Sequence, residues 1–203
     1  MTESRCGLLL LTGGGGLRLG GPKHLRPHPA GGSWGGRLVG IFREVCPEGP
    51  VMVLGAPLPD LPGLPRMEDP REGPAVALRF WAGRRVPDAR RWWVVPCDQV
   101  DWTAQGFEGW LEAAEAADPG GLAWALARVG QRPQPLGGLL GSALRLPLAG
   151  LAFTRVHELA AALPQAPLPA ECYQGMDVDT PEDLQAWDAS RGKGAFGPGA
   201  LHR

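Results

Sequence analysis

The sequence has little of what would hold a nucleic acid, span a membrane or build a cross-linked framework. Its 20 basic and 21 acidic side chains leave a net charge of −1, so no overall basic field exists to bind nucleic acid. The four cysteines are scattered without a CxxC pair, a spacing typical of neither a zinc site nor a disulfide framework. The apolar stretch over 136–153 is interrupted by Arg145 and Pro147. We expect a cytoplasmic protein without a nucleic-acid or membrane partner.

Lysine is nearly absent as well, because Lys23 and Lys193 are the only two in the chain. Glycine and proline, by contrast, number 31 and 22, a level often found in disordered chains. Eight tryptophans and a hydrophobic content of 44% favour a packed core instead. For 203 residues we expect a single domain over 1–188, followed by a mobile tail over 189–203.

Short apolar runs alternate with segments of helical periodicity, which predicts an α/β fold with a largely parallel sheet. The expected strands cover 7–11, 51–54, 92–95, 122–129, 136–140 and 176–178. The expected helices cover 38–45, 74–82, 104–117, 156–163 and a segment that begins at Pro181. Thr103 and Thr180 are the expected N-caps of two of these helices.

The most informative segment is the glycine run that follows the first expected strand. Consecutive glycines over 13–16 let several backbone N–H groups turn toward one anion. Arg18 and Lys23 add positive charge within reach of the same place. Open α/β sheets bind nucleotides at this end of a central strand. No Gly-Lys-Ser/Thr follows, so this is not a Walker loop, and a flexible turn with incidental charges is the alternative.

The segment 11–23 resembles the L-x-G-G-x-x-x-R-[ML]-G-x-x-K signature of nucleotidyltransferases with a glycosyltransferase-A-like fold. In particular it resembles the molybdenum cofactor guanylyltransferases. The resemblance implies a Rossmann-like three-layer sandwich with a mostly parallel mixed sheet, and it implies that Lys23 meets the phosphates, with help from Arg18. A second glycine, Gly14, is associated in this family with accepting guanine. The residues implied to meet the base are Leu11, Thr12 and Gly13.

Asp98 follows directly after the apolar run 92–97, at the end of an expected buried strand. A carboxylate there suits Mg²⁺, which prefers oxygen ligands, although such an aspartate more often forms a turn or a helix cap. The segment resembles the family's apolar run that ends in P-C-D, whose aspartate holds the metal. The family usually has a proline two residues later, where this chain has Val100, so the resemblance does not predict the shape of this loop.

Three further carboxylates are candidates for the same site. The segment 177–184 resembles the family's closing motif, in which guanylyltransferases often carry asparagines at the places of Asp177 and Asp179. We expect these two side chains to point to opposite sides of an extended segment, with Asp179 the one that reaches the metal or the phosphates. Asp69 resembles the family aspartate that precedes G-P and holds the nucleotide, through either the guanine edge or the ribose. A solvated turn is the alternative for Asp69.

These observations lead to one expected activity, a Mg²⁺-dependent guanylyl transfer. The terminal phosphate of molybdopterin, or of the molybdenum cofactor, would attack the α-phosphorus of GTP and release pyrophosphate. Asp98 and Asp179 would hold the metal. Transient contacts with other cofactor-biosynthesis proteins or molybdoenzyme chaperones are expected partners. The alternatives are a cytidylyl- or guanylyltransferase for another phosphorylated acceptor, and a nucleotide-binding regulator that has lost catalysis.

Overall fold

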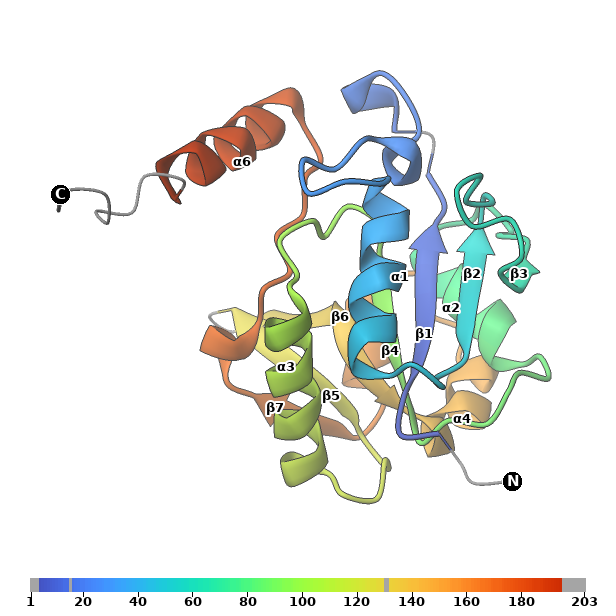
Figure 1. The fold of residues 1–203 in the computed structure, drawn as a ribbon. Helices are drawn as coiled ribbons and strands as arrows, with labels where there is room; N and C mark the ends of the chain where they lie inside the picture. Colours follow the sequence, from blue (N-terminus) through green and yellow to red (C-terminus); the bar gives the residue numbers. More distant parts are fainter. Residues whose placement is uncertain (1–3, 15, 130–131, 195–203) are drawn as a thin grey trace, which may run out of the picture.

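The structure is a computed structural model that describes residues 4–14, 16–129 and 132–194 (Figure 1). A single mixed sheet of seven strands has the order β3-β2-β1-β4-β6-β5-β7. The strands are β1 (Gly7–Thr12), β2 (Val51–Gly55), β3 (Arg66–Met67), β4 (Arg91–Pro96), β5 (Trp124–Val129), β6 (Arg132–Gly141) and β7 (Gln165–Leu168). Strand β6 runs antiparallel to β4 and β5, and the other neighbouring pairs are parallel.

Helices cover both faces of this sheet, as Figure 1 shows. The helices are α1 (Trp34–Val45), α2 (Pro74–Ala82), α3 (Ala104–Ala117), α4 (Arg145–Gly150), α5 (Val156–Ala161) and α6 (Pro181–Gly194). Short 3-10 turns are η1 (Leu17–Leu19), η2 (Lys23–Leu25), η3 (Ser142–Leu144) and η4 (Ala170–Cys172). Helices α1 and α3 pack on one face, and α2, α4 and α5 on the other. The predicted three-layer α/β fold with a mostly parallel mixed sheet is therefore confirmed.

Strands β1, β2 and β4 are apolar except at Thr12 and Arg91, because both of their faces are buried. In β1, Leu8 and Leu10 face the α1–α3 layer, while Leu9 points into the α2–α4–α5 layer. The two tryptophans of β4 divide in the same way. Trp93 stacks on a phenylalanine of α3 with 4.2 Å between ring centroids, and Trp92 meets a tryptophan of α2 edge-on at 5.3 Å. The tryptophans are thus the core of the sandwich.

Most expected elements appear within a few residues of their expected bounds. Helices α2 and α3 match the predicted ranges, and the Thr103 side chain accepts a hydrogen bond from the Gly106 amide, as an N-cap does. The strand expected over 176–178 is wrong, because this segment makes only an isolated bridge between Asp177 and Gln99. Helix α6 includes residues 189–194 of the expected tail, and 195–203 lie outside the described residues.

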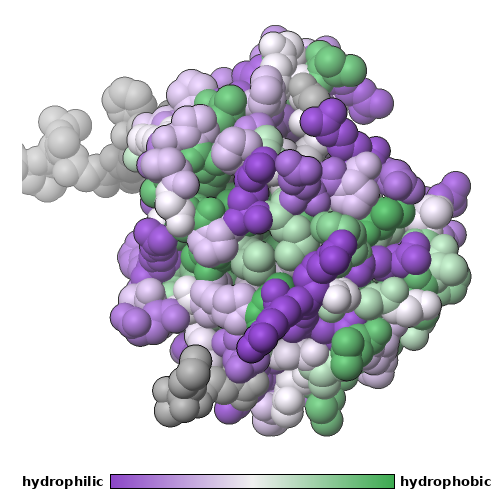
Figure 2. All heavy atoms as spheres, turned by 90° about the vertical axis from the view of Figure 1, so that its right-hand side faces the viewer, coloured by the Kyte–Doolittle hydropathy of each residue, from purple (hydrophilic) through white to green (hydrophobic). Residues whose placement is uncertain are grey.

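Within 4–14, 16–129 and 132–194, no helix combines the length and apolar character needed to cross a bilayer. Figure 2 shows hydrophilic and hydrophobic residues interspersed over one face of the molecule.

The topology places the loops that carry the candidate residues at one edge of the sheet. Strands β1, β2 and β4 are parallel neighbours, so the loops that follow them meet at their carboxyl ends. Helix α6 reaches the same edge through Trp187, which is 1% exposed and packs edge-on against Trp34 of α1. Val178, just before α6, is buried in the same small cluster. The end of the chain is thereby fixed beside the loops after β1 and β4.

Candidate active site

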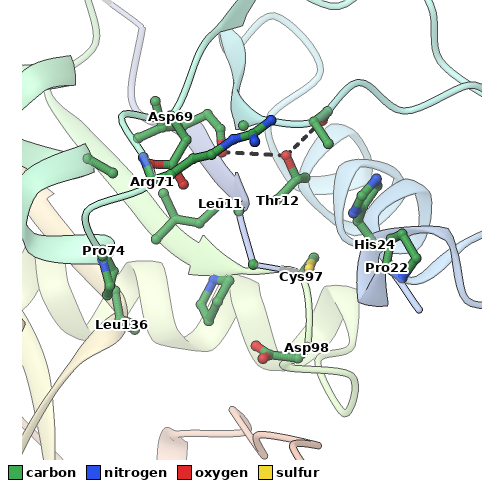
Figure 3. A pocket seen from close by; sticks show the side chains of 18 of the residues that line it. Leu11, Thr12, Pro22, His24, Asp69, Arg71, Pro74, Cys97, Asp98 and Leu136 are labelled. Atoms are coloured by element: carbon green, nitrogen blue, oxygen red, sulfur yellow. Dashed lines mark hydrogen bonds between the residues drawn. The ribbon is translucent and has the colours of Figure 1, made fainter. Parts of the chain in front are cut away.

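A cavity of about 1100 Å³ opens at the carboxyl ends of the central strands (Figure 3). Its walls come from the loops after β1, β2, β3 and β4, from the start of β6, and from the segment before α6. The residues on these walls include Leu11, Thr12, Gly13, Gly14, Gly55, Arg66, Asp69, Arg71, Cys97, Asp98, Leu136, Asp177 and Asp179. A typical small-molecule site measures about 300–1,000 Å³, so the space is just above the upper end of this range.

The glycine loop after β1 has a backbone that only glycine adopts easily. Gly14 and Gly16 have φ of +95° and +59°. The Gly16 carbonyl accepts hydrogen bonds from the amides of Leu19 and Gly21, which closes the η1 turn. A Cβ at Gly16 would lie 1.8 Å from the Gly21 carbonyl oxygen. Arg18 is exposed on η1 and lies outside the residues that line the cavity, so the structure does not bring it to the other candidates.

Asp69 lies directly against the end of β1, although the two are far apart in the sequence. Its Oδ1 accepts a hydrogen bond from the Arg71 amide at 2.8 Å, and a Cβ at Gly13 would lie 2.1 Å from its Oδ2. Thr12 is buried, and its hydroxyl donates to the Ala56 carbonyl at 2.7 Å. The Thr12 side chain therefore fixes the loop after β2, while Asp69 stands beside the glycine loop.

Replacing Gly13 by alanine tests this contact. The new methyl group would displace the Asp69 carboxylate, so we expect nucleotide affinity to fall by at least about tenfold, or about 1.4 kcal/mol. Gly40 is the matched control, since it lies exposed in α1 and a Cβ added there would meet open space. Gly40→Ala is expected to leave affinity unchanged and to stabilise the fold by about 0.5–1 kcal/mol. Calorimetric titration with GTP measures both affinities, and equal values for Gly13→Ala and wild type would contradict the assigned contact.

Lys23 joins two carboxylates from distant segments. Its Nζ donates to Asp98 Oδ2 at 2.7 Å and also donates to Asp179 Oδ1. The Lys23 side chain is 14% exposed and that of Asp98 18%, whereas that of Asp179 is 57% exposed. Burial alone would lower the pKa of Lys23, but the hydrogen bonds to Asp179 and Asp98 outweigh it and leave this pKa raised. The lysine is therefore held as a cation between the two aspartates.

The donor set around Lys23 fits a divalent cation. The ammonium itself shows that a positive charge is accommodated between Asp98 and Asp179. Asp98 Oδ1 is buried and has no hydrogen-bond partner in the part of the chain that the structure describes. Carboxylate oxygens are the ligands that Mg²⁺ and similar hard cations prefer. Among the described residues no group of three potential ligands assembles, so substrate phosphates and water would have to complete the coordination.

Both Asp177 and Asp179 line the cavity, so the expectation that they point to opposite sides is wrong. Residues i and i+2 of an extended segment share a face, and it is Val178 between them that points the other way. Val178 is fully buried, and its amide donates to the Asp98 carbonyl at 3.2 Å. Three carboxylates therefore line the same cavity, and two of them, Asp98 and Asp179, pair with Lys23.

The pKa values of two carboxyl groups near this cluster are shifted in opposite directions. Burial raises the pKa of Asp177, and the negative charges of Asp98 and Asp179 raise it further. Asp183, in the first turn of α6, has a lowered pKa because its carboxylate accepts hydrogen bonds from Thr180 and from the Asp179 amide. The bond from the Thr180 amide measures 2.8 Å. A raised carboxyl pKa makes the folded state less stable as pH rises. A lowered one adds stability at neutral pH that is lost on acidification.

We therefore expect Asp177→Asn and Asp183→Asn to have opposite effects on stability. At pH 7 the first removes an unfavourable buried charge and raises the free energy of unfolding, while the second removes a favourable one and lowers it. Both differences from wild type shrink as the pH falls and the carboxyl groups take up protons. Urea denaturation of each variant between pH 3 and pH 7 measures this, and changes of the same sign at pH 7 would contradict it.

Several residues of the cavity and its surroundings were not singled out by their sequence pattern. Arg66 donates to the Gly55 carbonyl at 3.3 Å, and Arg71 has a positive φ of 63°. His24 is 4% exposed, and burial lowers its pKa. Gln99, next to Asp98, is 1% exposed and fully hydrogen-bonded. For Gln99, the one signal in the sequence was that the segment after Asp98 departs from the family pattern.

The geometry of this chain has clear counterparts among solved structures. Rv0371c from Mycobacterium tuberculosis H37Rv is 19% identical, with a TM-score of 0.68 over 92% of this chain and 98% of that one. Molybdopterin-guanine dinucleotide biosynthesis protein A from Archaeoglobus fulgidus is 14% identical, with a TM-score of 0.67 over 92% and 98% of the two chains. The 2-C-methyl-D-erythritol 4-phosphate cytidylyltransferase from Thermus thermophilus is 17% identical, with a TM-score of 0.59 over 91% and 98%. At these identities the likeness shows the fold.

Sequence comparison supplies the family. No curated protein sequence matches this chain. Residues 8–166, however, match the MobA-like NTP transferase domain. This range begins in β1 and ends in β7, and it contains the glycine loop, Lys23, Asp69 and Asp98. The chain therefore belongs to the MobA-like NTP transferase domain family, and this membership supports nucleotidyl transfer as its activity.

Proposed function

We propose that this chain transfers GMP from GTP to the terminal phosphate of molybdopterin and releases pyrophosphate. One observation carries the proposal: the cavity has Gly13, Gly14 and Asp69 at one end and Asp98 at the other, where Lys23, which is not itself among the lining residues, pairs with Asp98. A nucleotide whose base lies at the first end brings its phosphates to the second. The Archaeoglobus fulgidus neighbour, named for molybdopterin-guanine dinucleotide biosynthesis, supports the choice of acceptor.

Asp69 is the residue proposed to orient the nucleoside. Its Oδ1 is engaged by the Arg71 amide, which leaves Oδ2, beside Gly13, to accept from the N–H groups of guanine or from a ribose hydroxyl. The proximity of Gly13 matters because a backbone without a Cβ lets the base approach the end of β1 closely. Leu11 and Thr12 form the adjacent wall, and Gly14 leaves open space above it.

Lys23 is proposed to bind the triphosphate and to stabilise charge on the leaving pyrophosphate. An acceptor phosphate is already ionised at neutral pH, so no side chain has to remove a proton from it. Catalysis therefore depends on positioning and on neutralising charge. A divalent cation held by Asp98 and Asp179 would supply further positive charge to the phosphates. A manganese complex has been solved for Rv0371c, 18% identical with a TM-score of 0.64, which supports a divalent ion in this fold.

A panel of nucleotides tests the proposal. The full chain is incubated with molybdopterin, Mg²⁺ and GTP, CTP, ATP or UTP in turn, and released pyrophosphate is measured. We expect GTP to give the fastest release and the guanine dinucleotide of the pterin to appear as product. Pyrophosphate from CTP alone would favour the second candidate, a cytidylyltransferase, which the Thermus thermophilus neighbour suggests. GTP binding without pyrophosphate from the pterin would overturn the proposed reaction.

A further inference from the structure

The buried amide of Gln99 lies at the centre of a hydrogen-bond network next to Asp98. Its Nε2 donates to Tyr173 Oη at 2.7 Å and to the Leu136 carbonyl at 3.3 Å. Its Oε1 accepts from the indole Nε1 of Trp102 at 3.2 Å. Tyr173 Oη donates in turn to the Leu136 carbonyl at 2.9 Å. Every polar atom of this side chain is therefore used, although only 1% of the residue is exposed.

The donors and acceptors of this network allow one orientation of the amide. The indole N–H of Trp102 can only donate, so it must face the oxygen of Gln99. The nitrogen then faces the Leu136 carbonyl, which can only accept. Tyr173 Oη completes the set because it accepts from Gln99 and donates to Leu136. Such a satisfied buried network holds its members in a single arrangement.

The space around the amide is closed by backbone. A Cβ at Gly137 or at Gly175 would lie 2.6 Å from Gln99 Oε1 in either case. Gly137 has a φ of +85°, which L side chains rarely adopt. The amide reaches its partners only because these two positions lack a side chain, so the network is built into the loops that surround it.

The network connects the segments that carry the three carboxylates. The main chain of Gln99 pairs with Asp177, and the Val178 amide donates to the Asp98 carbonyl at 3.2 Å. The main-chain amide of Gln99 also donates to the Pro96 carbonyl, where the turn through Asp98 begins. The side chain of Gln99 then ties this pair to β6 and to Tyr173, just after η4. The contacts that hold Asp98 at its distance from the segment 177–179 thus centre on Gln99.

We propose that Gln99 is a positioning residue: its buried amide fixes the distance between Asp98 and Asp179, and so the geometry in which they take a divalent cation together with the nucleotide phosphates. This inference rests on the proposed metal role of the two aspartates. It concerns a residue outside the cavity lining, which acts through the loops that it joins. Gln99 also stands within the segment where the chain departs from the family's proline pattern after Asp98.

The test compares cation binding in five forms of the full chain: wild type, Gln99→Met, Tyr173→Phe, the double variant of these two changes, and Gln165→Met. Methionine is close to glutamine in length but makes none of its hydrogen bonds. Gln165 is the matched control, because its amide donates to the Ala160 carbonyl at 2.8 Å and accepts from Arg128 at 3.1 Å, away from the cavity. The measured quantity is the Mn²⁺ dissociation constant by electron paramagnetic resonance, with a GTP analogue that carries a methylene bridge between the α- and β-phosphates.

We expect Gln99→Met to weaken Mn²⁺ binding by about tenfold, or about 1.4 kcal/mol, with little change in affinity for the analogue alone. Tyr173→Phe removes only one partner of the amide and is expected to weaken Mn²⁺ binding by about threefold. This second variant keeps the proposal testable if Gln99→Met does not fold. The double variant should be no weaker than Gln99→Met, because the tyrosine acts through the glutamine. Gln165→Met should bind Mn²⁺ as wild type does.

Unchanged Mn²⁺ binding in Gln99→Met and Tyr173→Phe would overturn the positioning role while leaving the proposed function intact. The same loss in Gln165→Met as in Gln99→Met would also overturn it, because the effect would then be general destabilisation. A wild-type chain that does not bind Mn²⁺ with the analogue would overturn the metal role of the aspartates and the positioning role with it.

Discussion

Replacing Asp98 by asparagine is expected to reduce metal-dependent turnover by at least about 100-fold, or about 2.7 kcal/mol, while the protein stays folded. Asp98 contributes the buried Oδ1, which has no partner among the described residues, and the Oδ2 that receives the Lys23 ammonium. Asparagine keeps the shape but places an uncharged amide group in the proposed cation site. Asparagine removes the charge that pairs with Lys23, which costs stability, but it also relieves repulsion with Asp177 and Asp179, so the net change in stability is expected to be small.

Pyrophosphate release across a Mg²⁺ titration measures this effect, with thermal unfolding as the check on folding. Asp88→Asn is the control, since this exposed carboxylate precedes β4, at the amino end of the strand whose carboxyl end leads to Asp98. We expect the control to show wild-type turnover. Near-normal turnover in Asp98→Asn would refute a role of this carboxylate in cation binding.

The fold was predictable because its determinants are local or periodic. The continuous apolar runs of β1 and β4 reflect burial on both faces of a parallel sheet. Thr103 and the Pro74 start gave the bounds of α3 and α2 through capping chemistry that acts within one turn. The glycine loop was recognisable because positive φ demands glycine over a short segment. In each case the physical cause lies within a few residues of the sequence.

The parts of the site that were missed depend on contacts between distant segments. Gln99 meets Tyr173 across 74 residues, and nothing in the neighbourhood of either residue signals the other. The position of Asp177 was misjudged for a local reason instead, because residues i and i+2 of an extended segment share a face and only Val178 between them points away. Arg18 matches the family signature in sequence, yet η1 turns it to the exposed surface. A motif specifies residue types, whereas the folded loops decide which of them meet.

The sequence analysis placed Lys23, Asp98 and Asp179 in one site but did not predict their direct ion pairs, and this contact gives the second large effect. Lys23→Ala is expected to reduce turnover by at least about 100-fold, or about 2.7 kcal/mol, because Asp98 and Asp179 then lack the neighbouring ammonium proposed to bind the triphosphate. Arg43→Ala, an exposed residue of α1, is the control and is expected to change turnover by less than about twofold. A loss below about tenfold, or about 1.4 kcal/mol, would reduce Lys23 to a structural ion pair.

A separate stability measurement tests the structural role of Lys23, apart from its proposed role in binding the triphosphate. The raised pKa of Lys23 means that its ion pairs stabilise the folded state below the pKa of a free lysine, and that this stability is lost at higher pH. Lys23→Ala should therefore be less stable than wild type at pH 7, and the difference in stability should close above about pH 10.5.

The Lys23→Ala variant also leaves Asp98 and Asp179 without their cation. Mn²⁺ added without nucleotide should consequently raise its melting temperature more than that of wild type, and an equal shift in both would contradict a shared position for ammonium and metal.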